Sequence, residues 1–307
     1  MPRMLFHRDF VEYTGGHGKV WDYFRHALAL GWEAQVYLTP RSLRSACNPW
    51  MQMPERIAPA WNPQACDLLF LAGMDWASLA TPLQPPRPVV NLLQSVRHAW
   101  QGHPLRGFLS APAHRICVSQ PVAGAVAATG EVNGALSVIP AALDVPAGLG
   151  GAWPGARARI LVAGLKAPEL ARALAAELEA TSLQLDLLDA WIPRDQYLQR
   201  VAAAAVLVAL PLPAEGFYLP ALEAMALGTP VVTLDCIGSR QYARSGENCL
   251  IAAPTVEDLA AAVRRSLQPE VAKGLIRQGT LTAAAFAMER ERRSFMDVLQ
   301  AVVGMRA

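Results

Sequence analysis

The sequence predicts an α/β protein built from two doubly wound domains, each a parallel sheet covered by helices on both faces. Short apolar runs typical of buried strands alternate with amphipathic helical patterns along nearly the whole chain, and this alternation favours parallel sheets. A segment dense in Gly, Pro and Ala, residues 142–158, divides the alternation into two blocks and is interpreted as a linker. The length of 307 residues suits two domains.

The first block opens with a strand, a turn, a helix and a strand, the order of a βαβ unit. The strand is MLFHRD, the Gly-rich turn is YTGGHGK, the helix is VWDYFRHALALG and the second strand is EAQVYLT. Gly31 suits the end of the helix. Residues 40–64, rich in Pro, Trp and Met, predict irregular structure. Further strands are expected at DLLFLAG, PVVNLLQ, RICVS and LSVIP, with a helix at VAGAVAATG.

The second block alternates in the same way. Strands are expected at ILVAGL, LQLDLLD, VLVALPL, TPVVTLD and CLIA. Helices are expected at APELARALAAELEA, RDQYLQRVAAA, PALEAMALG and VEDLAAAVRRSL, with one long helical pattern over 281–303. We therefore expect a first domain at 1–148, a second domain at 149–284, and a C-terminal helix at 285–307 that packs back on the first. Ligands of open parallel sheets bind beyond the carboxyl ends of the strands, so a cleft between the two domains is the expected site.

Composition excludes several classes of protein. The chain is 53% hydrophobic and carries a formal charge of +2 with both signs spread along it, which argues against a nucleic-acid partner. Five cysteines without a CxxC pair argue against a disulfide framework or a zinc site and favour the cytoplasm. The start MPRMLFHRDF has no apolar h-region, so we expect no signal peptide. No apolar run is long enough to span a bilayer, although peripheral membrane contact stays open.

The segment TGGHGKV follows the first strand and opens the first helix, where free N–H groups favour an anion. Gly15 and Gly16 would let a ligand approach the backbone closely. A P-loop is excluded because Tyr13 stands where that motif needs glycine and Val20 where it needs a hydroxyl. Two interpretations stay open, a ligand loop and an ordinary βα turn that needs positive φ.

Three charged residues lie where strands of the second block end. Lys166 follows the first of these strands and is either a phosphate partner or a solvated loop lysine. Glu223 falls in the first turn of a short helix, where the helix dipole alone would explain a carboxylate. Glu215 lies in the loop before that helix and should point into the cleft, where it could accept hydrogen bonds from sugar hydroxyls. The N–H groups of residues 216–219 could face a diphosphate.

The stretch EGFYLPALEAMALGTPVV resembles the E-x7-E region of retaining glycosyltransferases of the GT-B fold, in particular glycosyltransferase family 4, whose form is close to EGFGLPxLEAMAxGxPVV. Other segments resemble that family in the same order. They are TGGHGK with ALALGWEAQVYLT, RICVSQPVAGAVAATG, LSVIPAALDV and SGENCLIAAPTVEDLAAAV. The resemblance covers most of the chain and implies two Rossmann-like domains facing a cleft.

The resemblance also implies an activity. It implies a metal-independent, retaining hexosyltransferase without other cofactors, which moves a sugar from a nucleotide-diphosphate sugar to a glycan or lipid-linked acceptor. The expected role is bacterial surface polysaccharide synthesis, in the cytoplasm or peripherally at the inner face of the cell membrane. By resemblance, Glu215 lies beside the donor sugar, Lys166 neutralises the phosphates and Glu223 binds the ribose. The donor-binding residues would be Gly15, Gly16, Lys166, Glu215, Gly216, Phe217, Tyr218, Leu219 and Glu223.

The acceptor side is less clearly marked. Arg97 and His98 in SVRHAWQGHPLRGFL are candidates for acceptor contacts, and the alternative is a partly buried loop. Trp50 and Trp61 could stack on acceptor sugars or belong to the core. Leu165 stands where the family carries arginine, and the first domain is shorter than usual. Two other functions therefore stay open, a non-catalytic GT-B subunit that binds a glycan or partner, and a nucleotide-sugar epimerase.

Overall fold

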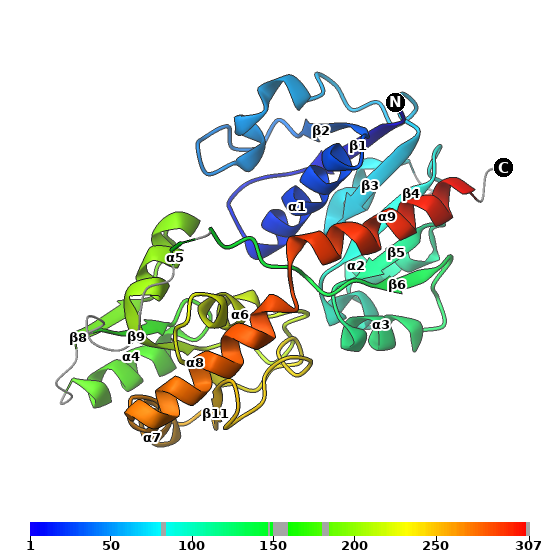
Figure 1. Ribbon diagram of the computed structural model, residues 1–307. Helices are drawn as coiled ribbons and strands as arrows, with labels where there is room; N and C mark the ends of the chain where they lie inside the picture. The colour runs from blue at the N-terminus through cyan, green and yellow to red at the C-terminus, as the bar shows by residue number, and fades with distance from the viewer. Residues whose placement is uncertain (81–83, 147, 150–158, 180–183, 305–307) are drawn as a thin grey trace. The chain divides into compact units, whose positions relative to one another are not determined.

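The computed structural model describes residues 1–80, 84–146, 148–149, 159–179 and 184–304 (Figure 1). The chain divides into two compact units. The first comprises Met1–Ala141 together with the chain from Glu289 onward, and the second comprises Ala142–Met288. The sequence placed these boundaries after residues 148 and 284. Residues 147 and 150–158 of the predicted linker lie outside the described residues.

The first unit contains a parallel sheet with six strands in its described part, in the order β2-β1-β3-β4-β5-β6. The strands are β1 Arg3–Arg8, β2 Glu33–Leu38, β3 Leu68–Ala72, β4 Val89–Leu93, β5 His114–Cys117 and β6 Leu136–Val138. Its helices are α1 Gly15–Ala29, α2 Pro104–Gly107, α3 Gln120–Ala127 and α9 Met288–Gly304. Short 3-10 turns are η1 Pro49–Gln52, η2 Pro54–Arg56, η3 Gly73–Ser78, η4 Val96–Ala99 and η5 Phe108–Ser110.

Aromatic side chains join α1 and α9 to one face of this sheet. Phe6 of β1 lies 5.2 Å from Phe24 of α1, between ring centroids. Tyr23 of α1 packs at 4.9 Å against Phe295 of α9. Trp50 of η1 is fully buried and packs edge-on against Phe24. Trp50 is therefore a core residue, which rules out the alternative that it stacks on an acceptor sugar in this structure.

The second unit contains a parallel sheet in the order β11-β10-β9-β7-β8. The strands are β7 Arg159–Ala163, β8 Gln184–Leu188, β9 Ala204–Ala209, β10 Val231–Leu234 and β11 Leu250–Ala252. The helices are α4 Pro168–Leu178, α5 Arg194–Ala203, α6 Leu219–Ala226, α7 Val256–Ser266 and α8 Pro269–Ala284. Strands β7 and β9 are neighbours although β8 and α5 lie between them in the sequence.

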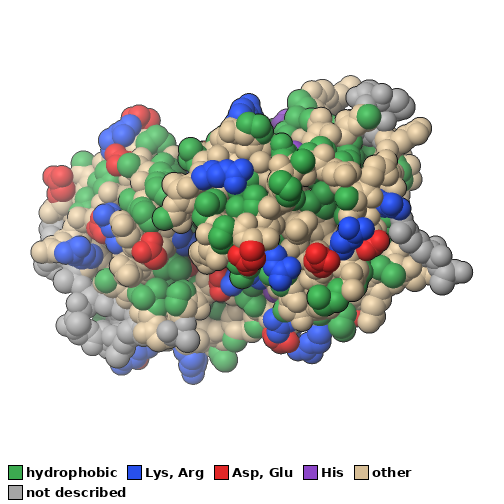
Figure 2. All heavy atoms as spheres, turned by 90° about the horizontal axis from the view of Figure 1, so that it is seen from above, with side chains coloured by type: hydrophobic (Ala, Val, Ile, Leu, Met, Phe, Trp, Pro, Cys, Tyr) green, Lys and Arg blue, Asp and Glu red, His purple; other side chains and the backbone are tan. Residues whose placement is uncertain are grey.

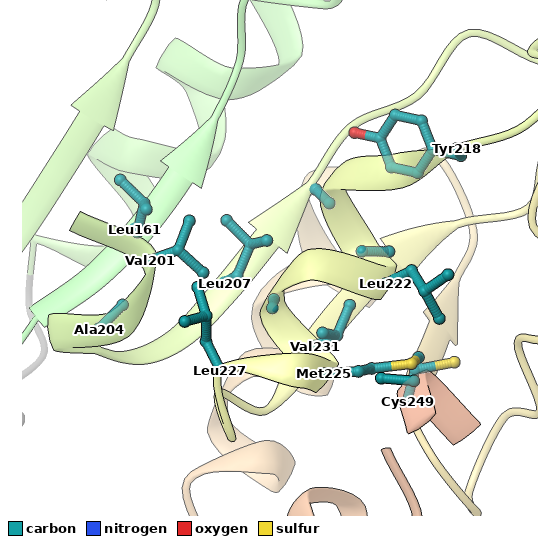
Figure 3. Close-up of a cluster of buried hydrophobic side chains, with 14 of the residues drawn as sticks. Leu161, Val201, Ala204, Leu207, Tyr218, Leu222, Met225, Leu227, Val231 and Cys249 are labelled. Carbon is teal, nitrogen blue, oxygen red and sulfur yellow. The ribbon is translucent and has the colours of Figure 1, made fainter. Parts of the chain in front are cut away.

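Both faces of this second sheet are apolar because successive strand residues point to opposite sides. Leu161 of β7 and Leu207 of β9 join the cluster formed with α5 and α6 (Figure 3). Their neighbours Val162 and Val206 join the opposite cluster with α4 and α7. Helices on both faces are what a doubly wound sheet requires, and the predicted architecture of two parallel-sheet α/β domains is confirmed.

The C-terminal region differs from the prediction. The pattern over 281–303 is not one helix, since α8 ends at Ala284 and α9 begins at Met288. At the break, the Phe286 carbonyl accepts a hydrogen bond from Leu143 N–H at 2.8 Å. Leu143 and Ala287 also form an isolated parallel β-bridge. No Gly or Pro marks this break in the sequence AAAFAMER, because a tertiary contact and not a local signal interrupts the helix. Helix α8, which begins at Pro269, was also not predicted.

On the face drawn in Figure 2, basic and acidic side chains are interspersed. All five cysteines are free thiols. Within the described ranges, no helix combines the length and apolar character needed to cross a membrane.

Candidate active site

Lys166 and Glu215 meet at the carboxyl edge of the second sheet. Lys166 lies in the loop from β7 to α4, and Glu215 lies in the loop from β9 to α6. Because β7 and β9 are adjacent and parallel, their carboxyl ends coincide. Nζ of Lys166 forms an ion pair with Oε1 of Glu215, and the two side chains are 42% and 17% exposed. The pair therefore lies at the solvent boundary, where a ligand can reach both charges.

The aromatic ring of Tyr218 packs against the Lys166 side of this pair. Its ring centroid lies 5.6 Å from Lys166 Nζ, within the range of a cation–π contact. The residue is buried, and burial followed by the Glu215 charge raises the pKa of the Tyr218 phenol well above its ordinary value. Its carbonyl accepts a hydrogen bond from the Tyr242 hydroxyl. Tyr218 is thus a buried, neutral aromatic residue whose ring contacts the Lys166 ammonium group.

Gly238, which the sequence interpretation missed, packs closely against the backbone of the loop that carries Glu215. A Cβ at this position would lie 2.7 Å from Phe217 N and 2.8 Å from the Glu215 carbonyl oxygen. The Gly238 carbonyl accepts a hydrogen bond from Tyr218 N–H at 3.4 Å. The adjacent Ile237 N–H donates to the Pro213 carbonyl at 3.1 Å. The only available sequence signal was a glycine shortly after β10.

Glu223, one turn into α6, is 2% exposed and is held by Arg194. Nη1 of Arg194 lies 2.5 Å from Oε1 of Glu223, and Nη2 donates to the Asp144 carbonyl at 3.1 Å. The prediction that Glu223 lies in the first turn of the helix is wrong, because α6 begins at Leu219 and its first turn has no acidic residue. An ion pair with Arg194, and not a place in the first turn, holds the carboxylate. Arg194 was not identified from the sequence. Its position as the first residue of α5 was a usable signal, because a cation at a helix N-terminus opposes the dipole.

The remaining residues predicted to bind the donor in the second unit follow Glu215 at this edge. Gly216 and Phe217 lie in the loop between Glu215 and α6, and Leu219 is the first residue of α6. The Phe217 ring packs at 5.8 Å against Tyr242 and at 5.7 Å against Phe286. The backbone at 216–219 therefore has a rigid apolar support. Its predicted contacts to a sugar or a diphosphate stay predictions.

In the first unit, Gly15 and Gly16 form the first turn of α1. Thr14 caps this turn by accepting a hydrogen bond from His17 N–H at 3.3 Å. Neither glycine has positive φ, so the alternative of a turn that needs that conformation is wrong. A Cβ on Gly15 would meet no atom within 4 Å, which leaves open space above the helix end. The predicted approach of donor phosphates to these glycines stays a prediction.

The segment after β4 is arranged differently from the expectation based on His98. His98 is 3% exposed, and burial lowers its pKa to about 4, so its ring is neutral. Arg97 lies over the Trp100 ring at 5.8 Å. It is Gln94 that reaches the Gly-rich turn, where its Nε2 donates to the Gly16 carbonyl at 3.2 Å. A buried His98 supports the alternative of a partly buried loop, and Gln94 is the residue that the sequence interpretation missed.

The two parallel-sheet α/β units have the architecture of the GT-B fold. Residues 149–269 match the family model described as "Glycosyl transferases group 1". The matched residues lie within the second unit.

Individual proteins resemble the chain over different extents. A curated D-inositol 3-phosphate glycosyltransferase from Saccharomonospora viridis is 35% identical over 158 residues, which are 47% of this chain and 35% of that protein. The chain thus spans about a third of the length of this relative. Among solved structures, sucrose-phosphate synthase from Thermosynechococcus elongatus has a TM-score of 0.74 at 16% identity, covering 99% of this chain and 100% of that one. Anabaena HepE, solved with UDP and glucose, has a TM-score of 0.77 at 14% identity, covering 98% and 100%. At these identities the structural likeness establishes the fold.

Proposed function

We propose that the chain is a retaining, family 4-like glycosyltransferase that moves a hexosyl group from a nucleotide-diphosphate sugar to a glycan or lipid-linked acceptor. The observation that carries this proposal is the Lys166–Glu215 pair at the carboxyl edge of β7 and β9. The match of this segment to the group 1 family supports it. Bacterial surface polysaccharide synthesis is the proposed role, and the free thiols suit the reducing cytoplasm.

The proposed chemistry follows from the charges at this edge. In transfer, the bond from the anomeric carbon to the diphosphate breaks and a bond to the acceptor oxygen forms on the same face of the sugar. The acceptor proton passes to the leaving phosphate. The leaving group gains negative charge, which Lys166 and the N-terminus of α6 would stabilise electrostatically without a metal ion. Glu215, then released from Lys166, would accept hydrogen bonds from the sugar hydroxyls.

One observation favours a second candidate. Leu165 is 54% exposed in the loop beside Lys166, where the family carries a second cation. A site with fewer cations would stabilise a diphosphate leaving group less well. The second candidate is therefore a GT-B subunit that binds a nucleotide sugar or glycan without transferring the sugar.

The test begins with a thermal-shift screen of the full chain against a panel of nucleotide-diphosphate sugars, since a bound ligand raises the stability. The sugar that stabilises most is then used to follow nucleotide release, with and without glycan acceptors. We expect turnover, and we expect Glu215→Gln to lower it by about 10²- to 10³-fold, as for loss of one group that stabilises a transition state. Glu169→Gln is the control, because Glu169 pairs with Arg172 on the exposed side of α4.

The outcomes separate the candidates. Turnover by Glu215→Gln at the wild-type rate would contradict the role of Glu215. Binding of a nucleotide sugar without any release of nucleotide would favour the non-catalytic subunit. Release of a sugar epimer while the nucleotide stays attached would indicate an epimerase.

A further inference from the structure

The ion pair between Arg194 and Glu223 is built into the second unit from three separate segments. Glu223 is on α6, Arg194 begins α5, and the carbonyl of Asp144 lies in the segment that enters the unit. Glu223 is 2% exposed and the Arg194 side chain 30% exposed. The guanidinium is therefore anchored at two points, with Nη1 on the carboxylate and Nη2 on the carbonyl.

Local preferences do not explain Arg194. A cation in the first turn of a helix opposes the macrodipole, and Pro193 before it provides no side-chain cap. The unfavourable interaction of Arg194 with the helix dipole is offset by its ion pair with Glu223. Loss of the cation from such a buried carboxylate is strongly destabilising. A residue placed against local preference is typical of a functional or strained position.

The two carboxylate oxygens of Glu223 differ in their contacts. Oε1 accepts from Arg194, whereas Oε2 has no hydrogen-bond partner among the residues that the structure describes. An ionised carboxylate offers about four acceptor positions, so this oxygen retains capacity. The hydroxyl of Tyr197, one turn along α5, is also buried without a partner in the described part of the chain. Burial, and after it the Glu223 charge, raises the pKa of Tyr197 well above its ordinary value.

We propose that Arg194 is a positioning residue that holds Oε1 of Glu223 and thereby presents Oε2 to a ribose hydroxyl of the donor nucleotide. This inference rests on the proposed function, which assigns Glu223 to the ribose. It adds that the orientation of the carboxylate depends on Arg194 and on its second anchor at Asp144. Lysine would replace it only in part, because a single ammonium group lacks the planar fork that reaches both Glu223 Oε1 and the Asp144 carbonyl oxygen.

The experiment compares ribose recognition in variants of the full chain. The probe is whichever of UDP, GDP and ADP gives the largest thermal shift with the wild type, together with its 2′,3′-dideoxy form. Calorimetry measures both affinities, and their ratio reports the ribose hydroxyls alone. We expect the wild type to prefer the ribose form by about 10- to 100-fold, the range for hydrogen bonds to a charged group. In Arg194→Met the ratio should fall to near one, and in Arg194→Lys it should fall part of the way.

Arg200→Met is the matched control. Arg200 lies on the same helix and pairs with Asp186 at 3.2 Å, away from Glu223, so its ratio should stay at the wild-type value. If Arg194→Met weakens both nucleotides equally, Arg194 is only structural and the proposal is overturned. If Arg194→Met does not fold, Arg194→Lys decides, and an unchanged ratio there overturns the proposal.

Two results with the wild type would overturn either the inference or the proposed function. A wild type that binds a nucleotide but does not distinguish its dideoxy form also overturns the inference. A wild type that binds none of the three nucleotides contradicts the proposed function instead.

Discussion

Lys19 of the first unit and Lys166 of the second differ in their sequence context and in their burial. Lys19 lies in the Gly-rich segment TGGHGKV, which the sequence left open as a ligand loop, while Lys166 follows a strand without any glycine-rich motif beyond Gly164. In the structure, Lys19 is 3% exposed, and its Nζ lies 2.8 Å from both Asp22 and Glu291. Lys166 has a 42% exposed side chain and pairs with Glu215. The lysine beside the more suggestive motif is structural, and the plainer one lies at the candidate active site.

The difference arises from the elements that carry the two residues. Lys19 is on α1, and helical spacing places it on the same side as Asp22, three residues later, facing α9. Burial by itself would lower the pKa of Lys19, but the Glu291 and Asp22 charges outweigh it and the pKa is raised. Lys166 is in a loop at a strand end, where no helix face constrains its direction. Whether a lysine is buried or exposed therefore depends more on the helix or loop that carries it than on the motif beside it.

The largest stability effect is expected from Lys19→Met. This change leaves Glu291 buried without its ammonium partner, which should cost about 3–5 kcal/mol of unfolding free energy. Urea unfolding of the full chain, with hydrogen exchange read in α1 and α9, measures the loss and locates it in the first unit. Arg25→Met is the control, because Arg25 pairs with Asp22 from a partly exposed position. A normal stability combined with lost nucleotide affinity would place Lys19 at the ligand instead.

A second effect concerns pH and another buried basic group of the first unit, His98. Its folded pKa of about 4 lies below the ordinary 6.5, so the unfolded chain binds a proton that the folded chain does not. Stability is therefore full above pH 6.5 and falls as the pH decreases towards 4, by about 3 kcal/mol in total. His98→Leu should flatten this part of the pH profile, measured by urea unfolding from pH 7.5 to 4.5. An equally steep profile in the variant would mean that other groups cause it.

A smaller effect is expected at the loop that carries Glu215. Gly238→Ala places a Cβ against the backbone of Phe217 and Glu215, and overpacking of this kind costs about 1–3 kcal/mol. Nucleotide-sugar affinity should fall with it, because the loop must move. The control is Gly274→Ala in α8, where a Cβ meets nothing within 4 Å and helix propensity gains up to about 1 kcal/mol. Equal stability of the two variants would show that the loop tolerates the shift.

The smallest stability effect is expected from Lys166→Met, and it completes the comparison with Lys19. An exposed ion pair contributes only about 0.2–1 kcal/mol, so urea unfolding should change little. Affinity for a nucleotide diphosphate should nevertheless fall by about tenfold, the loss of one charge-assisted contact. Calorimetry with UDP, GDP or ADP measures this. A loss of stability as large as that of Lys19→Met would remove the distinction between the two lysines.

The site residues that depend on neighbours in the sequence could be predicted, and those that depend on distant residues could not. Glu215 could be identified because its loop lies directly after a buried strand, and local spacing was sufficient. The setting of Glu223 was predicted wrongly, since the residue lies beyond the first turn of α6 and its partner Arg194 is 29 residues away along the chain. Gly238 and Gln94 act on backbone from distant segments. No pattern around either residue indicates that contact.

The sequence by itself determined the strands of the two sheets, most of the helices between them, and the position of Glu215 at a strand end. Periodicity of apolar residues specifies these features, and it depends on neighbours only a few residues apart. The tertiary structure alone decided that β9 lies beside β7, that Arg194 covers Glu223, and that Lys19 turns inward. Such choices depend on which distant surfaces bury apolar area and pair charges together, and no short stretch of the chain contains that information.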